Sequence, residues 1–163
     1  MNFTIRKAVE SDTNQMADIF NYYIRNSFAA FPVEEMEAPL FFNIMKNISF
    51  PGTVYVVDVD GKIAGFGIIK RLYESSVFNR AAEPGYFMLP GFTGKGIGSK
   101  LLETMEADAR KLDIKIFFAG ISSVNTGSLD FHKKHGFKEC GRFNKAGFKK
   151  GQEFDIVWMQ KSI

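Results

Sequence analysis

The spacing of hydrophobic residues along the chain predicts a protein that mixes strands and helices. Alternating or β-branched runs indicate strands, and apolar residues three or four positions apart indicate helices. Strands are expected near residues 3–7, 53–58, 63–69, 81–88, 115–121, 137–143 and 154–159, and helices near 12–24, 39–48, 97–112 and 125–135. The order is therefore strand, two helices, three strands, helix, strand, helix and two strands, which predicts an α/β fold.

Glycine and proline residues mark the expected turns between these elements. Asp60-Gly61 predicts a tight hairpin turn, and Pro51-Gly52 is expected to end the second helix. The polar stretch 144–152 is expected to be a loop. Pro84-Gly85 is expected to interrupt its strand with a bulge, because proline cannot donate a hydrogen bond in a sheet. No linker or repeat divides residues 1–163, so one domain is expected.

Composition and charge narrow the class of protein. The net charge of +3 is small and the basic residues are scattered, so nucleic acid is not an expected partner. No run approaches the roughly 18 apolar residues of a membrane span, and the start lacks the apolar core of a signal peptide. The one cysteine, Cys140, excludes an internal disulfide and fits a reducing cytoplasm; we expect it to be buried.

A glycine-rich loop, Thr93-Gly94-Lys95-Gly96-Ile97-Gly98, stands between an expected strand and an expected helix. Glycine allows positive φ angles and lets a ligand approach the main chain closely. The first N–H groups of a helix have no partner within the helix and carry partial positive charge. The stretch therefore predicts a binding site for a phosphate or pyrophosphate. Its spacing fits neither a dinucleotide-binding fingerprint nor a Walker A loop.

A second motif follows the strand expected at 115–121. It reads Asn125-x-x-Ser128-x-x-Phe131-His132-x-x-x-Gly136-Phe137. Together the two motifs resemble the GNAT superfamily of N-acetyltransferases, whose loop has the form Gln/Arg-x-x-Gly-x-Gly/Ala. Thr93 departs from that form at its first position.

The chain looks most like the phosphinothricin and methionine sulfone acetyltransferase branch of this superfamily. The matching features are Asn21, the run Ser27 to Phe31, Glu83, His132 and the ending from Gly147 to Gln160. The resemblance implies a twisted, mostly antiparallel sheet of six to seven strands with helices on both faces. It also implies that the central strands splay apart to admit the pantetheine arm of coenzyme A.

The resemblance implies acetyl transfer from acetyl-CoA to the primary amine of a small molecule, such as an amino acid or an analogue, by direct attack in a ternary complex. Two alternatives remain open, namely acetylation of a protein or peptide amine and a catalytically silent acyl-CoA-binding module. The resemblance also implies a homodimer, and the 18 phenylalanines offer apolar surface for an interface. No metal site is assigned.

The branch resemblance assigns Glu83 as the catalytic base, which is useful because an amine attacks a thioester only when neutral. His132 is either a general acid for the departing thiolate, a cofactor contact or a packing residue. Asn125 is expected to hold the pantetheine amide or to cap the last helix, and one side chain could serve both; His135 is expected to cap the end of that helix. The expected cofactor-binding residues are Met88, Leu89, Gly94, Lys95, Gly96, Ile97, Gly98, Ser99, Asn125 and Ser128.

The substrate pocket of the branch is built from the segment after the first helix, the loop before Glu83 and the Glu83 strand. By resemblance the substrate-binding residues are Phe28, Phe31, Arg71, Tyr73, Ser76, Val77, Phe78, Tyr86 and Phe87. The resemblance also implies an arginine near Tyr73 that binds the substrate carboxylate. Arg71 is the expected residue, because it lies two positions before Tyr73 and residues two apart on a strand share a face.

Overall fold

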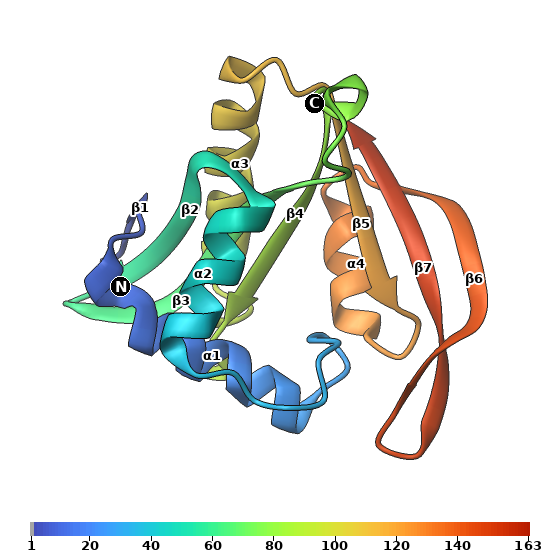
Figure 1. Cartoon of the computed structure of the whole chain (residues 1–163), viewed down its shortest axis with the longest axis horizontal. Helices are drawn as coiled ribbons and strands as arrows, with labels where there is room; N and C mark the ends of the chain where they lie inside the picture. Colours follow the sequence, from blue (N-terminus) through green and yellow to red (C-terminus); the bar gives the residue numbers. More distant parts are fainter. Residues whose placement is uncertain (1) are drawn as a thin grey trace.

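The computed structural model describes residues 2–163, which form one seven-stranded sheet and four α-helices (Figure 1). The strands are β1 (Thr4–Lys7), β2 (Ser49–Val59), β3 (Lys62–Arg71), β4 (Ala81–Met88), β5 (Ile116–Ser122), β6 (Lys138–Lys149) and β7 (Gln152–Ser162). The α-helices are α1 (Thr13–Asn26), α2 (Ala38–Ile48), α3 (Ile97–Lys111) and α4 (Thr126–Lys134). Short 3-10 turns lie at Glu10–Asp12, Ser76–Phe78 and Pro90–Phe92.

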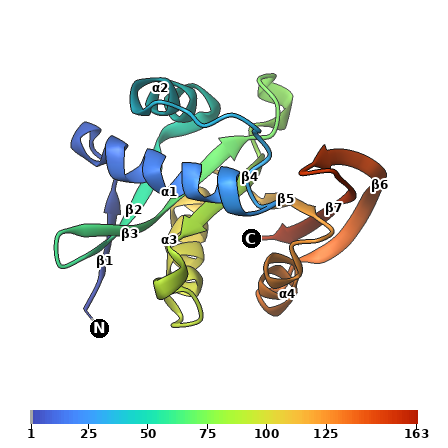
Figure 2. The ribbon, with the colours of Figure 1, turned by 90° about the horizontal axis from the view of Figure 1, so that it is seen from below.

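The strand order is β1-β2-β3-β4-β5-β7-β6, and every neighbouring pair is antiparallel except β4 and β5. Helices cover both faces of this sheet, with α1 and α2 on one side and α3 and α4 on the other (Figure 2). The expected fold class is therefore confirmed. The apolar stripe of α1 packs Met16, Phe20 and Ile24 against one face, and that of α3 packs Leu101 and Met105 against the other.

The first hairpin follows the sequence prediction, whereas the end of α2 does not. Asp60 and Gly61 have φ angles of 52° and 83°, as a tight hairpin turn with two left-handed residues requires. Helix α2 ends at Ile48, and Pro51-Gly52 lies within β2, where the pairing with β3 is irregular between Ser49 and Val54. The proline and glycine therefore disturb a strand and do not end the helix.

The sheet divides between β4 and β5. These two parallel strands pair only at Ala81 with Ile116 and at Ala82 with Phe117, and then diverge (Figure 1). The expected bulge at Pro84-Gly85 is wrong, because the register of β4 with β3 continues through both residues without a shift. Beyond Ala82 no strand pairs with β4 on the β5 side, so a proline there costs no hydrogen bond on that edge.

The last hairpin closes the wide end of this division. The expected loop at 144–152 is wrong, since β6 continues to Lys149 after an irregularity and only Lys150-Gly151 form the turn. The turn meets the connection between α1 and α2, where the Lys149 ammonium donates to the carbonyl of Ala30 at 2.7 Å. Phe154 of β7 also contacts the rings of Phe28 and Phe31. The gap is therefore closed at its narrow end by the pairing of β4 with β5 and at its wide end by the contact of this hairpin with the α1–α2 connection.

Candidate active site

A cleft of about 720 Å³ occupies the space between the diverging strands β4 and β5. Its walls come from α1, α2 and the connection between them, from β3, β4, β5 and α4, and from the glycine loop with the first turn of α3. One end of the cleft lies at the N-terminus of α3, and the other lies beside α2 and the Glu83 segment of β4. The two ends differ in chemistry, and we describe them in turn.

The glycine loop forms the end of the cleft at α3. Gly94 and Gly96 have φ angles of 72° and 79°, a conformation that side chains disfavour, and Gly96 is the N-cap of α3. No side chain of the described chain caps α3, so its first N–H groups stay available to an anion. A Cβ atom placed at either glycine would meet nothing within 4 Å, so the space above the loop is open. This loop fits a pyrophosphate.

Not every residue of the expected cofactor set lines this end. Gly94, Gly96, Gly98 and Ser99 do. The Lys95 ammonium instead donates to the carbonyl of Gly91 at 2.7 Å, and Ile97 is buried in the core below α3. Leu89 packs against the α1 and α2 side of the sheet and is not part of the cleft wall.

His135 lies at this end as well, where sequence reasoning gave it only a capping role. It is the C-cap residue of α4, as expected. Its Nδ1–H donates to the carbonyl of Phe131 at 2.8 Å, and its Nε2 forms a hydrogen bond with the Ser99 hydroxyl at 2.9 Å. This contact joins the end of α4 to the start of α3, and both residues line the cleft.

Met88, Asn125 and Ser128 lie along the cleft between its two ends. The Met88 carbonyl accepts a hydrogen bond from the Tyr23 hydroxyl, which shows that this carbonyl faces the cleft side of β4. Asn125 is the N-cap of α4, and its side-chain oxygen accepts from the Ser128 N–H at 3.3 Å, so the capping alternative for Asn125 is confirmed. The unpaired edge of β4 also leaves backbone groups free for an extended ligand.

Glu83 is the sole carboxylate among the described residues that line the cleft. It lies opposite Lys70 in the pairing of β3 with β4, and the Lys70 ammonium is 2.8 Å from its Oε1. The two side chains are 25% and 27% exposed, so both remain open to a ligand in the cleft. Sequence reasoning did not single out Lys70, because its place opposite Glu83 depends on the register of β3 with β4, which is not visible in the sequence.

His132 is buried and paired on both ring nitrogens. Because a carbonyl can only accept, its Nδ1–H donates to the Ser128 carbonyl at 2.7 Å. Its Nε2 therefore accepts from the Tyr86 hydroxyl at 2.6 Å. Burial lowers the pKa of His132 to about 4, so the ring is neutral at pH 7 and has no spare proton for a leaving group.

Tyr86 holds the hydroxyl proton in this pair. Burial raises the pKa of Tyr86 well above its usual range, so the phenol stays protonated. The ring stacks on His132 and meets Phe131 edge-on, which fixes the hydroxyl on the α4 side of the cleft. In this pair the phenol is therefore the donor and the imidazole is the acceptor.

The expected substrate residues divide into two groups. Phe31, Tyr86 and Phe87 line the cleft, and Phe28, Arg71, Tyr73, Ser76, Val77 and Phe78 do not. Arg71 donates to the Ser49 carbonyl at 2.6 Å and covers the Phe50 ring, so its guanidinium is engaged away from the cleft. Val77 and Phe78 border a separate hollow of about 230 Å³.

Helix α2 supplies part of the cleft wall that the sequence did not assign. Ile44, Met45 and Ile48 face β3 and line the cleft beside Ile68. Their signal was the helical spacing of 39–48, which predicts a buried face but not what lies under it.

The prediction that Cys140 is buried is wrong. Cys140 is exposed on β6, the edge strand of the sheet, whose residues on either side of it are exposed as well. Among the described residues no helix is long and apolar enough to cross a membrane.

Comparison with known proteins identifies the family. The sequence profile of the acetyltransferase (GNAT) family matches residues 16–137. The chain is 24% identical to a phosphinothricin N-acetyltransferase of Streptomyces coelicolor, over 98% of this chain and 95% of that protein. It is 27% identical to an L-amino acid N-acyltransferase of Escherichia coli, over 98% of this chain and 94% of that protein.

Solved structures give the same result. The structure of yncA from Salmonella typhimurium, described with its cofactor acetyl-CoA, superposes with a TM-score of 0.89 at 25% identity, covering 99% of this chain and 94% of that one. The open glycine loop at α3 and the free edge of β4 fit such a cofactor here. The chain therefore belongs to the GNAT family and is an acetyl-CoA-dependent N-acetyltransferase.

Proposed function

We propose that the enzyme acetylates the primary amine of a small molecule, an amino acid or an analogue, with both substrates bound in the cleft at once. One observation carries this proposal: Glu83, the sole carboxylate among the described residues of the cleft wall, shares the cleft with the glycine loop of α3. The names of the relatives, which act on amino acids and their analogues, support the choice of substrate.

Glu83 acts as the base in this proposal. An amine of pKa about 10.4 costs roughly 4.6 kcal/mol to neutralise at pH 7, so a positioned carboxylate accelerates the reaction. Glu83 accepts the proton that the amine loses, directly or through a water molecule. Its partner Lys70, 2.8 Å away, keeps a cation beside the carboxylate before the amine binds.

The opposite wall serves the leaving group and the cofactor. The backbone of Gly94 to Ser99, with Met88, Asn125 and Ser128, holds coenzyme A, which when acetylated supplies the acetyl group as a thioester. In the resting pair the Tyr86 hydroxyl donates its one proton to His132 Nε2 at 2.6 Å, so His132 holds this hydroxyl in place until the hydroxyl turns to give the proton to the departing sulfur. In this arrangement His132 is a positioning residue, and its general-acid alternative is not retained because the ring is neutral.

A substrate screen tests the proposal. Amino acids, sulfoximines and polyamines are incubated with acetyl-CoA, and release of the coenzyme A thiol is measured. We expect turnover of at least one small amine, and binding of coenzyme A in a separate calorimetric titration. Binding without turnover of any small amine would replace the proposal by a silent binding module, and turnover of lysine-containing peptides alone would replace it by a protein acetyltransferase.

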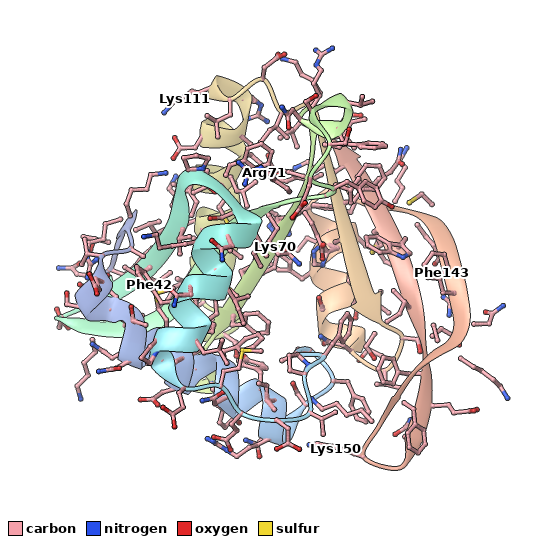
Figure 3. The ribbon with its side chains drawn as sticks, in the orientation of Figure 1. Phe42, Lys70, Arg71, Lys111, Phe143 and Lys150 are labelled. Atoms are coloured by element: carbon pink, nitrogen blue, oxygen red, sulfur yellow. The ribbon has the colours of Figure 1, made fainter. Side chains whose placement is uncertain are left out.

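We also propose a homodimer that works in the cytoplasm. Edge strand β6 exposes the rings of Phe143 and Phe148, which are 58% and 71% exposed, and Figure 3 shows Phe143 on the outer rim of the sheet. An exposed edge with apolar side chains is suited to a second copy of the chain. Small-angle scattering at micromolar concentration should give a dimer mass, and a monomer mass would contradict the proposal.

A further inference from the structure

The amine end of the cleft carries one pair of opposite charges on an apolar wall. Glu83 and Lys70 are the charged residues there, whereas the other cleft-lining lysine, Lys134, belongs to the end of α4 next to His135 and the glycine loop. Ile44, Met45 and Ile48 of α2 lie across from Ile68, which is two residues before Lys70 on the same face of β3.

The Lys70 side chain passes over β4 at Gly85. A Cβ atom at Gly85 would lie 3.8 Å from Lys70 Cε and 3.2 Å from Ile68 Cγ2. The lysine stem therefore crosses the strand above this glycine, and its ammonium reaches Glu83. Figure 3 shows Lys70 near the middle of the molecule, beside α2 in this view, with Arg71 above it.

We propose that Lys70 binds the carboxylate of the substrate, and that the preferred substrates are amino acids with an apolar side chain and a single carboxylate. This inference rests on the proposed function. The ammonium and carboxylate of a free amino acid insert between Lys70 and Glu83, the carboxylate on the Lys70 ammonium and the ammonium on Glu83. The side chain then lies against Ile44, Met45, Ile48 and Ile68.

Charge balance favours this arrangement over binding of a simple amine. Before binding, Lys70 and Glu83 neutralise each other, and after a zwitterion inserts, each of the four charges again has an opposite neighbour. A simple ammonium would occupy Glu83 and leave Lys70 without its anion in a mostly apolar cleft. A side chain with a second anion would find no further cation at this end among the described lining residues.

Arg71, the cation that sequence reasoning chose for this role, cannot take it without leaving its present contacts. Its guanidinium is bonded to the Ser49 carbonyl and stacked on Phe50. Neighbouring residues on a strand point to opposite faces, so Lys70 and Arg71 cannot both face the cleft. The geometry assigns the carboxylate to Lys70.

The test compares each amino acid with the amine that remains when its carboxylate is removed. The pairs are L-methionine with 3-(methylthio)propylamine and L-leucine with 3-methylbutylamine, and kcat/KM is measured for each by thiol release. We expect the wild-type enzyme to prefer the amino acid. Lys70→Met should reduce that preference about 10- to 100-fold, because one charged hydrogen bond is lost, with the change mainly in KM.

Two further variants act as controls. Lys46→Met removes an exposed lysine of α2 outside the cleft wall and should keep the preference. Lys70→Arg keeps a cation at this position and should retain most of the preference for the amino acid over the amine. The ratio of preferences between variant and wild type cancels the different pKa values of the paired amines.

The possible failures can be told apart. If the wild-type enzyme acetylates amines but prefers the decarboxylated member, or if Lys70→Met leaves the preference unchanged in a folded protein, the assignment of Lys70 is wrong and the acetyltransferase proposal stands. If the wild-type enzyme acetylates neither member of any pair nor any other small amine, the proposed function fails and this inference fails with it.

Discussion

At the α3 end of the cleft the binding groups are backbone amides, whereas at the α2 end they are side chains. The first end needs glycine at positions 94 and 96, where φ is positive, and little else. The second end depends on an ion pair between Lys70 and Glu83, on two different strands, set against apolar residues of α2. A ligand shared by a whole family can be held by backbone geometry, but a particular substrate requires particular side chains.

The largest expected effect is a loss of turnover at the amine end of the cleft without a change of cofactor binding at the other end. Glu83→Gln removes the base while keeping the size of the side chain, and should lower kcat about 10²- to 10⁴-fold. Calorimetry should show coenzyme A binding unchanged, since the residue lies at the amine end. Glu74→Gln, on an exposed loop outside the cleft, is the matched control. Unchanged turnover in Glu83→Gln would remove this residue from the mechanism.

The wall between the two ends gives the next prediction. The pKa of His132 is about 4, below its usual value near 6.5, so the folded protein favours the neutral ring. The resulting contribution to the free energy of unfolding is complete above about pH 6.5. It is lost as the pH falls toward 4, by up to roughly 3 kcal/mol. Urea unfolding of the wild-type protein should show this loss, and His132→Phe should show a flatter dependence. Equal slopes for both proteins would mean that His132 is charged or exposed.

The cofactor end should respond to backbone strain. Gly96→Val places a β-branched residue at a φ of 79°, which costs about 1–2 kcal/mol, so the affinity for acetyl-CoA should fall roughly 10-fold. Preference among amines should not change. Gly91→Ala, at a glycine with no close neighbour and no positive φ, serves as the comparison. A normal affinity in Gly96→Val would show that this turn does not shape the cofactor site.

The smallest effect concerns Arg71, next to Lys70 on the same strand. Arg71→Met loses the bond to the Ser49 carbonyl and the contact with Phe50. The free energy of unfolding should fall by about 1 kcal/mol, measured by chemical denaturation. A fall in stability for Arg71→Met and a change of substrate preference for Lys70→Met would give two adjacent basic residues separate roles.

Sequence patterns were most accurate where contacts are local. The Asp60-Gly61 hairpin, the Asn125 cap and the glycine loop depend on φ angles and hydrogen bonds within a few residues. The predictions at Pro51, Pro84 and the stretch 144–152 were wrong for one reason: a breaker or a polar run is tolerated when the neighbouring strand is irregular or absent. Which edge of a strand stays unpaired is a property of the whole sheet.

The sequence by itself determined the order of strands and helices, the glycine turn that can hold an anion and the family to which the chain belongs. Only the tertiary structure decided that Lys70, and not Arg71, faces Glu83, and that Tyr86 carries the proton beside His132. The physical reason is distance along the chain. Local spacing sets backbone conformation, but the partner of a charge or a proton is set by strand register and helix packing, which join residues far apart in sequence.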